Sequence, residues 1–364
     1  MGGRYDNIQV LRFVAAGLVV TAHSVDLAAT RLGLETVLAG GGLENFGAVG
    51  VDIFFVISGF IIATTTRGQA GLAAAGGFLW RRFRRVAPIY WLLSLPILIG
   101  MARGGTLSPE VASATFLFWP FSGLSMTFPA LGPGWSLCFE MLFYAAFGLA
   151  IIGGRWVGGR RMGWALVGAY LAMMAAGLVL ASPVLRFVGA PIVLEFLLGV
   201  GVALIWRRLP RRAGVWAVGL ALAGFGLGLV FGYGGVSGEA ALNDPWTGLM
   251  RAAVWGLPSG LLVLGLVRME RMYQAPGSWR RRLIFMGDAS YAVYLVHVLV
   301  IRVLGRAFEM TGISAPGDAV VVLTIIASLA AGAVVHLWVE TPLLRLMSGN
   351  APAPLDARLR RPVA

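Results

Sequence analysis

The feature that most constrains this chain is a series of apolar runs of about twenty residues, separated by short polar loops. A run of about that length spans the hydrocarbon core of a bilayer as one α-helix. Fifty-eight per cent of the 364 residues are hydrophobic and 12% are charged, whereas a soluble domain carries about 25% charged residues. The chain cannot build a water-facing surface from this composition, so we expect an all-α, polytopic integral membrane protein.

The apolar runs predict about ten transmembrane helices and one domain. The expected spans are 8–28, 47–66, 86–101, 136–153, 164–181, 190–206, 215–232, 248–267, 289–306 and 318–340. The stretch 108–122 is too short and too broken to span, so we interpret it as interfacial or re-entrant. We assign residues 1–346 to a transmembrane domain and expect the Pro-, Ala- and Arg-rich stretch 347–364 to be a disordered cytoplasmic tail.

The distribution of arginine predicts the orientation of these helices. Consecutive loops between the predicted spans lie on opposite sides of the membrane. The even-numbered loops, which share one side with both chain ends, carry together with these ends 22 of the 29 basic residues. The odd loops carry only Arg31, Arg103, Arg186 and Arg306. Because basic residues concentrate on the cytoplasmic side, we expect both termini in the cytoplasm. The location that we expect for the protein is the bacterial inner (plasma) membrane.

The same distribution explains the net charge of +13. Nucleic-acid binding needs one continuous basic face, whereas these arginines are spread over several loops, so we expect no nucleic-acid partner. There is no lysine, which excludes a Walker A loop and Schiff-base chemistry. The single cysteine, Cys138, cannot form an internal disulfide, and no zinc spacing or other metal site is evident. No cleavable signal peptide is expected, because the first apolar run continues at spanning length beyond Arg12.

Ionisable side chains inside the predicted spans form a layer. Insertion of a charged side chain at the centre of a transmembrane helix costs about 2.5–3.5 kcal/mol, so each such residue is expected to have a structural or functional role. From the helical rise, His23, Asp52 and Glu140 all lie roughly 8 Å below the outer face of the membrane. A histidine with a nearby carboxylate suits general-base chemistry. Asp52 has a second interpretation, a structural hydrogen bond to the first helix. Snorkelling toward the interface explains three further members of the layer equally well: Glu195, Arg251 and Arg302.

Arg12 precedes His23 by eleven residues, which is about three helical turns. The two side chains therefore share one face of the first helix, about 16 Å apart, with Arg12 near the cytoplasm. A cation at the inner mouth and a base deep in the membrane suit an elongated anionic ligand such as acyl-CoA. Arg82 and Arg85 lie three residues apart and could hold its phosphates. There are two alternatives. Arg12 could anchor the helix to lipid phosphates, and the RRFRR run (residues 81–85) could be a stop-transfer flank.

A second histidine, His297, lies near mid-membrane in the ninth span, three residues after Tyr294. It lines the same cavity or forms a hydrogen bond between helices, and the spacing favours neither. His336 and Glu340 share a helix face and are interpreted as a local polar pair.

In this order, six motifs cover the chain: LRFVAAGLVVTAH, GVDIFFVISGF, RRFRRVAPIYW, GWSLCFEMLFY, GDASYAVYLVH and VETPL. Over residues 5–346 the chain thereby resembles the acyltransferase-3 family of membrane acyltransferases, most closely its exopolysaccharide-production branch. The resemblance implies transfer of an acyl group, usually acetyl, from cytoplasmic acyl-CoA to a sugar hydroxyl of an extracellular or lipid-linked polysaccharide. Acyl-CoA is then a donor substrate and not a permanently bound cofactor.

The resemblance also implies roles for single residues. His23 is the expected catalytic histidine, Arg12 its acyl-CoA partner, and Arg82 and Arg85 help to hold the donor. Glu140 is the acidic residue of the Trp-Ser-Leu motif. Other polar and aromatic side chains of the motifs are expected to contact the substrates: Trp135, Ser136, Tyr144, Tyr294 and His297.

We expect His23 either to deprotonate the sugar hydroxyl or to accept the acyl group as a transient acyl-imidazole. Glu140, with Asp52, would fix the tautomer of its ring and stabilise its charged form. The rival hypothesis is a secondary transporter for an anionic solute, but no repeat symmetry of the transporter kind is visible. Expected partners are acyl-CoA, a glycan acceptor and membrane lipids, and a homo-oligomer is compatible with the sequence.

Overall fold

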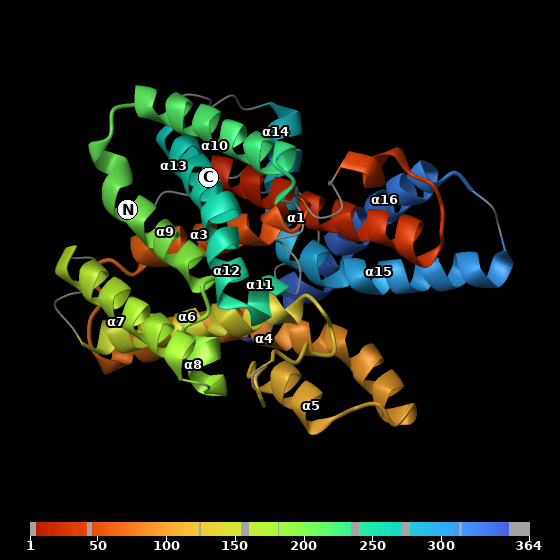
Figure 1. Ribbon diagram of the computed structural model, residues 1–364, viewed down its shortest axis with the longest axis horizontal. Helices are drawn as coiled ribbons and strands as arrows, with labels where there is room; N and C mark the ends of the chain where they lie inside the picture. Colours follow the sequence, from red (N-terminus) through yellow and green to blue (C-terminus); the bar gives the residue numbers. More distant parts are fainter. Residues whose placement is uncertain are drawn as a thin grey trace.

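A computed structural model of the chain describes residues 5–41, 46–123, 125–153, 160–180, 182–233, 240–270, 277–312 and 315–348. Every regular element within these ranges is a helix (Figure 1), which confirms the all-α fold. The expected tail, 347–364, lies outside the described residues except for Met347 and Ser348.

Each predicted span coincides with a helix or an unbroken helical series. These are α1 (Asp6–Asp26) with the π-helical turn η1 (Leu27–Arg31), α3 (Val49–Thr65), α4 (Leu72–Arg103), α6 (Gly134–Ile152), α7 (Arg160–Val179), α9 (Val193–Ile205) with η3 (Trp206–Arg208), α10 (Arg212–Val230), the series α12 (Pro245–Arg251), η5 (Ala252–Gly256) and α13 (Leu257–Arg268), α15 (Ser290–Thr311), and the series α16 (Gly317–Val335), η6 (His336–Glu340) and α17 (Thr341–Leu346). The short elements are η2 (Val37–Gly41), α5 (Pro109–Phe116), α8 (Pro183–Val188), α11 (Ala240–Asn243) and α14 (Ser278–Asp288).

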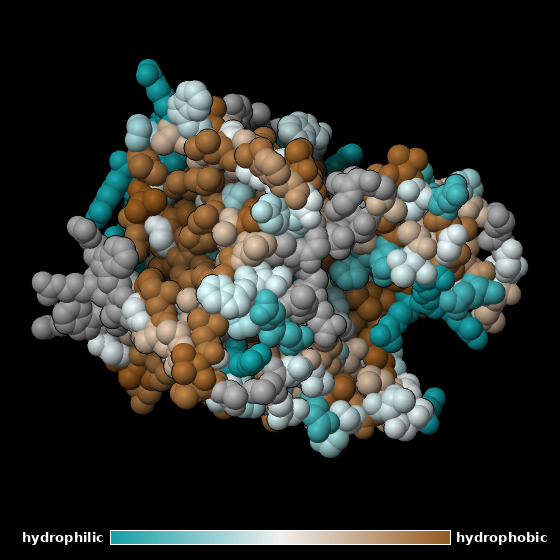
Figure 2. Space-filling model, in the orientation of Figure 1, coloured by the Kyte–Doolittle hydropathy of each residue, from teal (hydrophilic) through white to brown (hydrophobic). Residues whose placement is uncertain are grey.

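Eight helical segments among the described residues are long and apolar enough to cross a membrane. Two shorter apolar helices, Val49–Thr65 and Val167–Val179, coincide with the remaining predicted spans. Large apolar side chains are exposed on the outside of the molecule, as Figure 2 shows over the region of α9, α10 and α13. Such a surface is stable in contact with lipid and not with water. The protein is therefore a polytopic integral membrane protein, and the count of ten spans stays a prediction.

The helix α4 is longer than the span predicted at 86–101. It begins at Leu72, directly after Gly71, whose φ of 89° lies in the left-handed region that favours glycine. Ala75 and Phe78 are buried on the face that continues into the span, so their packing extends the helix by about four turns. The arginines of the RRFRR run consequently lie within a rigid helix and not at its start.

Helix ends that the arginine count places on the inner side meet each other. The ring of Tyr5, at the start of α1, packs edge-on against Phe60 of α3 and Trp206 of η3, at 5.2 and 6.0 Å between centroids. The backbone N–H of Gly71 donates to the carbonyl of Ile151 at 2.9 Å. The ring contacts join the start of α1 to the ends of the second and sixth predicted spans, and the hydrogen bond joins the loop after the second span to the end of the fourth.

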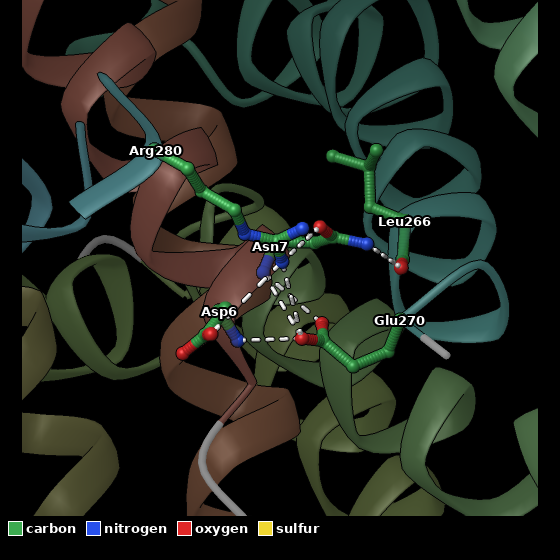
Figure 3. A network of polar contacts seen from close by, with 5 residues as sticks. All are labelled: Asp6, Asn7, Leu266, Glu270 and Arg280. Carbon is green, nitrogen blue, oxygen red and sulfur yellow. Dashed lines mark hydrogen bonds and ion pairs between the residues drawn. The ribbon is translucent and has the colours of Figure 1, made fainter. Parts of the chain in front are cut away.

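The start of α1 is also bound to the end of α13 (Figure 3). The backbone N–H groups of Asp6 and Asn7 donate to the carboxylate of Glu270, at 2.7 and 3.0 Å. The side-chain amide of Asn7 donates to Leu266 O at 3.1 Å and accepts from Arg280 at 3.3 Å. Partial burial raises the pKa of Glu270, and the N–H donors oppose that shift. A carboxylate at these unpaired N–H groups caps the helix from outside it and fixes its height.

Loops predicted on the outer side also meet each other. Arg31, after α1, pairs with Glu309 near the end of α15 at 2.8 Å. Asn243 accepts from the backbone of Met126 at 2.7 Å and from Arg186 at 3.2 Å. The helix ends thus separate into the two groups that the arginines predict. The cytoplasmic location of one group, and with it of both termini, stays a prediction.

Small residues let α1 and α3 pack closely against their neighbours. A Cβ at Gly50 of α3 would lie 2.2 Å from the carbonyl oxygen of Ala15 in α1. A Cβ at Gly59 would lie 2.0 Å from Phe196 O, and one at Gly199 would lie 2.0 Å from Val56 O. All three separations are shorter than any real contact between a Cβ and an oxygen atom, so only glycine fits at these positions. The helix α3 is thereby held between α1 and α9.

A buried ion pair links α3 to α12. Arg251 donates through Nε and Nη2 to the two carboxylate oxygens of Asp52, at 2.9 and 3.0 Å, and both side chains are at most 1% exposed. The guanidinium lies 5.6 Å from the ring centroid of Trp135 in α6. Glu195 of α9 is fully buried beside this pair, and its carboxyl group interacts with Asp52 and Arg251. Two members of the layer first explained by snorkelling, Arg251 and Glu195, are therefore interior residues.

We expect Asp52→Asn to destabilise the fold by about 3–5 kcal/mol, because it removes the carboxylate partner of a buried guanidinium. Thermal unfolding of the purified protein in detergent measures the effect. Asp26→Asn, which makes the same charge change at an exposed position of α1, is the control and should change stability by no more than about 0.5 kcal/mol. Equal melting temperatures of the two variants would contradict the interpretation.

The orientation can be tested with single cysteines, because the native Cys138 is buried and should not react. Thr106→Cys lies on the predicted outer side and Arg211→Cys on the inner side, and both positions are exposed. In intact spheroplasts, we expect a membrane-impermeant maleimide to label Thr106→Cys alone. Arg211→Cys should react only after permeabilisation, and the opposite pattern would invert the predicted orientation.

Candidate active site

One face of α1 carries the two residues that the sequence singles out. Arg12 lies near the inner end of the helix, half-buried, and its Nη1 donates to Gln9 Oε1 at 3.4 Å. His23 lies three turns further along, and its side chain is exposed. Between them the helix packs against α3, α14, α15 and α16. The helix thus connects a cation at one level with an imidazole at another, as the spacing predicts.

A cavity of about 160 Å³ lies between α1, α3, α4, α6 and α15. It follows α3 from Val51 to Ile61, which is a length of about 15 Å. Its polar lining comes from Gln9, Arg12, Ser58, Arg82, Arg85, Ser136, Glu140, Tyr144, Tyr291 and Tyr294. Its apolar lining includes Phe54 and Phe55. The cavity is therefore elongated, and its wall contains both polar and apolar side chains.

Three guanidinium groups line the cavity: Arg12 of the first half of α1, and Arg82 and Arg85 of the first half of α4. The guanidinium of Arg82 lies over the rings of Phe78 and Tyr144, at 5.7 and 5.6 Å from their centroids. The positive charges of Arg12 and Arg85 repel each other. The negative charges of Asp288 and Glu340 attract the guanidinium group of Arg12. Guanidinium groups gathered in this way form a site for an anion with several oxygens, such as a phosphate.

Glu140 belongs to this arginine end of the cavity. Its carboxylate accepts hydrogen bonds from the hydroxyl of Tyr144 and, at 3.1 Å, from Ser58. No hydrogen bond joins it to His23 in the part of the chain that the structure describes. The expected role of Glu140 in orienting the imidazole therefore has no support in this geometry, although the carboxylate does line the cavity.

Asp52 is also placed differently from the sequence expectation. Both its carboxylate oxygens face Arg251, and the residue is completely buried. Trp135 packs on the same guanidinium and on the ring of Phe55, so it supports the ion pair and does not line the cavity. These two residues therefore stabilise the wall of the site.

Ser136 and Tyr294 lie at the opposite end of the cavity from the arginines. Their hydroxyl groups are 2.8 Å apart, and each lies within hydrogen-bonding distance of Pro133 O. The ring of Tyr294 is 5.9 Å from Phe54 and 6.1 Å from His297, measured between centroids. Tyr294 thus connects the cavity wall to the second histidine.

His297 lies directly against His23. Their ring centroids are 5.1 Å apart and the rings meet edge to face. His297 is completely buried, whereas His23 is exposed. His297 does not line the cavity, and its Nδ1 lies near Val293 O of its own helix. Its contact with the neighbouring helix is the ring contact with His23. Along the protein, the order is arginines, cavity, Tyr294, His297 and His23.

Three polar residues that line the cavity are not among those predicted from the sequence: Gln9, Ser58 and Tyr291. Ser58 is the only hydroxyl within the apolar run GVDIFFVISGF, and this isolation is the signal that would have identified it. Tyr291, whose hydroxyl donates to Val86 O at 2.8 Å, and Gln9 also line the cavity. Neither is distinguishable from an interfacial side chain by sequence alone.

This arrangement can bind an extended ligand with an anionic head and an apolar body, and it presents an imidazole beyond the far end. The Nδ1 of His23 lies 2.9 Å from Val19 O. Because a carbonyl only accepts, Nδ1 carries the proton and the lone pair of the neutral ring lies on Nε2. That atom is available as a base or as a nucleophile.

The chain is similar to a known protein family and to two known proteins. The family of the acyltransferase domain (Acyl_transf_3) matches residues 5–338. The exopolysaccharide production protein ExoZ of Rhizobium meliloti (strain 1021) is 33% identical over 317 residues, covering 83% of this chain and 90% of ExoZ. The acyltransferase MdmB of Streptomyces mycarofaciens is 26% identical over 344 residues, covering 85% of this chain and 84% of MdmB. No solved structure matches. Since the match extends over nearly all the described helices, the chain belongs to the acyltransferase-3 family of membrane acyltransferases.

Proposed function

We propose that this acyltransferase moves an acyl group, of which acetyl is the simplest, from cytoplasmic acyl-CoA to a sugar hydroxyl of an extracellular or lipid-linked polysaccharide. We place it in the bacterial inner membrane, with both termini in the cytoplasm. The family supports acyl transfer, and the name of its relative ExoZ, an exopolysaccharide production protein, supports a glycan acceptor. Family membership favours an enzyme over a transporter for an anionic solute.

The observation that carries the donor proposal is the elongated cavity with three arginines at one end. Coenzyme A has a phosphate-bearing head and a long, thin arm. Its phosphates would bind Arg12, Arg82 and Arg85, and the arm would follow α3 toward Ser136 and Tyr294. The thioester would then meet the imidazole of His23 from the inside, while the acceptor approaches the exposed side of this ring.

His23 would act in one of two ways. As a general base, its Nε2 takes the proton of the sugar hydroxyl while the hydroxyl oxygen attacks the thioester carbon. As a nucleophile, Nε2 takes the acyl group first and passes it to the sugar. In both, the C–S bond breaks and coenzyme A leaves as the thiol. Ser136 and Tyr294 lie nearer to His23 than Tyr144 does along this route, so their hydroxyls are our candidates for stabilising the carbonyl oxygen.

The central test supplies labelled acetyl-CoA to membranes that contain the wild type, His23→Ala or Arg12→Ala, and measures labelled glycan. We expect His23→Ala to lose at least about 10²-fold in rate, the typical contribution of a positioned proton-transfer group. Arg12→Ala should lose donor affinity. Arg67→Ala, at an exposed inner loop outside the cavity, is the control for Arg12. Normal labelling of glycan by His23→Ala would refute the mechanism.

Binding of acyl-CoA to the purified protein separates donor recognition from turnover. Arg82→Ala and Arg85→Ala should each weaken binding by about 10- to 100-fold, because a charge-assisted hydrogen bond contributes about 1.5–3 kcal/mol. Arg84→Ala is the matched control, since Arg84 lies on the same helix but does not line the cavity. If all three variants bind acyl-CoA equally, the arginine end of the cavity is not the donor site.

A further inference from the structure

The contact between His23 and His297 has a defined chemistry. Each Nδ1 lies near the carbonyl one turn earlier in its own helix, at 2.9 Å from Val19 O and 3.3 Å from Val293 O. Because these carbonyls can only accept, both rings carry their proton on Nδ1 and, when neutral, a lone pair on Nε2. The two imidazoles therefore meet as two bases in the same tautomer.

The Nε2 atom of His297 is buried and has no hydrogen-bond partner among the described residues. The neighbouring Tyr294 does not serve it, because its hydroxyl bonds to Ser136 and Pro133. His23 is the titratable side chain that acts on His297 across the interface. A neutral His23 has no free N–H to offer. Once its Nε2 is protonated, it has one, and the unpaired acceptor lies in the ring beside it.

We propose, on the basis of the acyl transfer proposed above, that His297 is a positioning residue for His23. Its neutral Nε2 accepts a hydrogen bond from the Nε2–H that His23 gains when it deprotonates the sugar hydroxyl. Rotation of the rings about their side-chain bonds converts the edge-to-face contact into this N–H···N bond. The hydroxyl oxygen forms the C–O bond, the C–S bond breaks, and the coenzyme A thiolate takes the proton from His23. His297 remains neutral throughout.

The placement of the carboxylates supports this assignment. Glu140 is bonded to Tyr144 and Ser58, and Asp52 to Arg251, so neither is the partner of His23. A carboxylate beside His23 would also stabilise the charged ring before the reaction and would thereby occupy the lone pair that catalysis needs. A buried neutral imidazole stabilises the charge only while the proton is present, because full burial disfavours a charge on His297 itself.

Three variants test the proposal in the purified, full-length protein. His297→Leu should lower kcat by about 10²-fold and leave the Kd for acetyl-CoA within about twofold. His297→Gln keeps an acceptor oxygen and should retain at least about a tenth of the wild-type kcat. Ser290→Ala removes another buried, unpartnered polar group from the same helix and should leave both constants unchanged. A kcat of His297→Leu within about threefold of wild type, or a loss confined to Kd or melting temperature, would overturn the proposal.

A second measurement does not depend on turnover. The chain has only three histidines, so ring ¹⁵N signals of the wild type can be assigned with single variants. Protonation of His23 should shift the Nε2 signal of His297, and this shift should vanish in His23→Ala. An unchanged Nε2 signal would overturn the imidazole pair even if acyl transfer is observed. If the shift occurs but no acyl group is transferred from acetyl-CoA, the proposed function fails and the pair stands.

Discussion

The arrangement of the whole site depends on how α1 is held. Its first N–H groups bind Glu270 at the end of α13, and its backbone touches α3 at Gly50. A helix capped from another element cannot slide along its axis without breaking those bonds. Because one rigid helix carries both Arg12 and His23, the distance between the anion site and the imidazole follows from helical rise alone. The other helices then build a cavity beside that fixed distance.

The second constraint is the apolar interior of a membrane bundle, which offers polar side chains few hydrogen-bond partners. Polar groups there must satisfy one another, and this requirement decides which partners the carboxylates have. Asp52 pairs with Arg251, a residue 199 positions later in the chain, and Glu140 pairs with hydroxyl groups of α3 and α6. The side chain of His23 then contacts another imidazole, that of His297, across the helix interface. The helix packing thus gives both carboxylates partners other than His23.

The same dependence on helix packing explains which parts of the fold and the site could be predicted from the sequence. Hydropathy predicts spans, because length and composition decide insertion, and the spacing of Arg12 and His23 predicts their shared face, because both lie on one helix. Depth grouped Asp52 and Glu140 with His23, but depth does not tell how each helix is rotated about its axis. The contact of His23 with His297 depends on that rotation and on the packing of α1 against α15, so no local pattern indicates it. The early start of α4 was missed because its first residues are small and only weakly apolar.

The inner arginines connect topology with the proposed chemistry. Basic residues orient a membrane protein because they remain in the cytoplasm during insertion. Arg82 and Arg85 belong to the densest such cluster, yet they also line the cavity, since α4 extends beyond the predicted span and turns that side of the cluster inward. In the predicted orientation, the arginines that orient the chain also place the proposed anion site on the cytoplasmic side. A donor made in the cytoplasm would meet that site without a separate recognition domain, and only the acyl group would need to pass beyond the bundle centre.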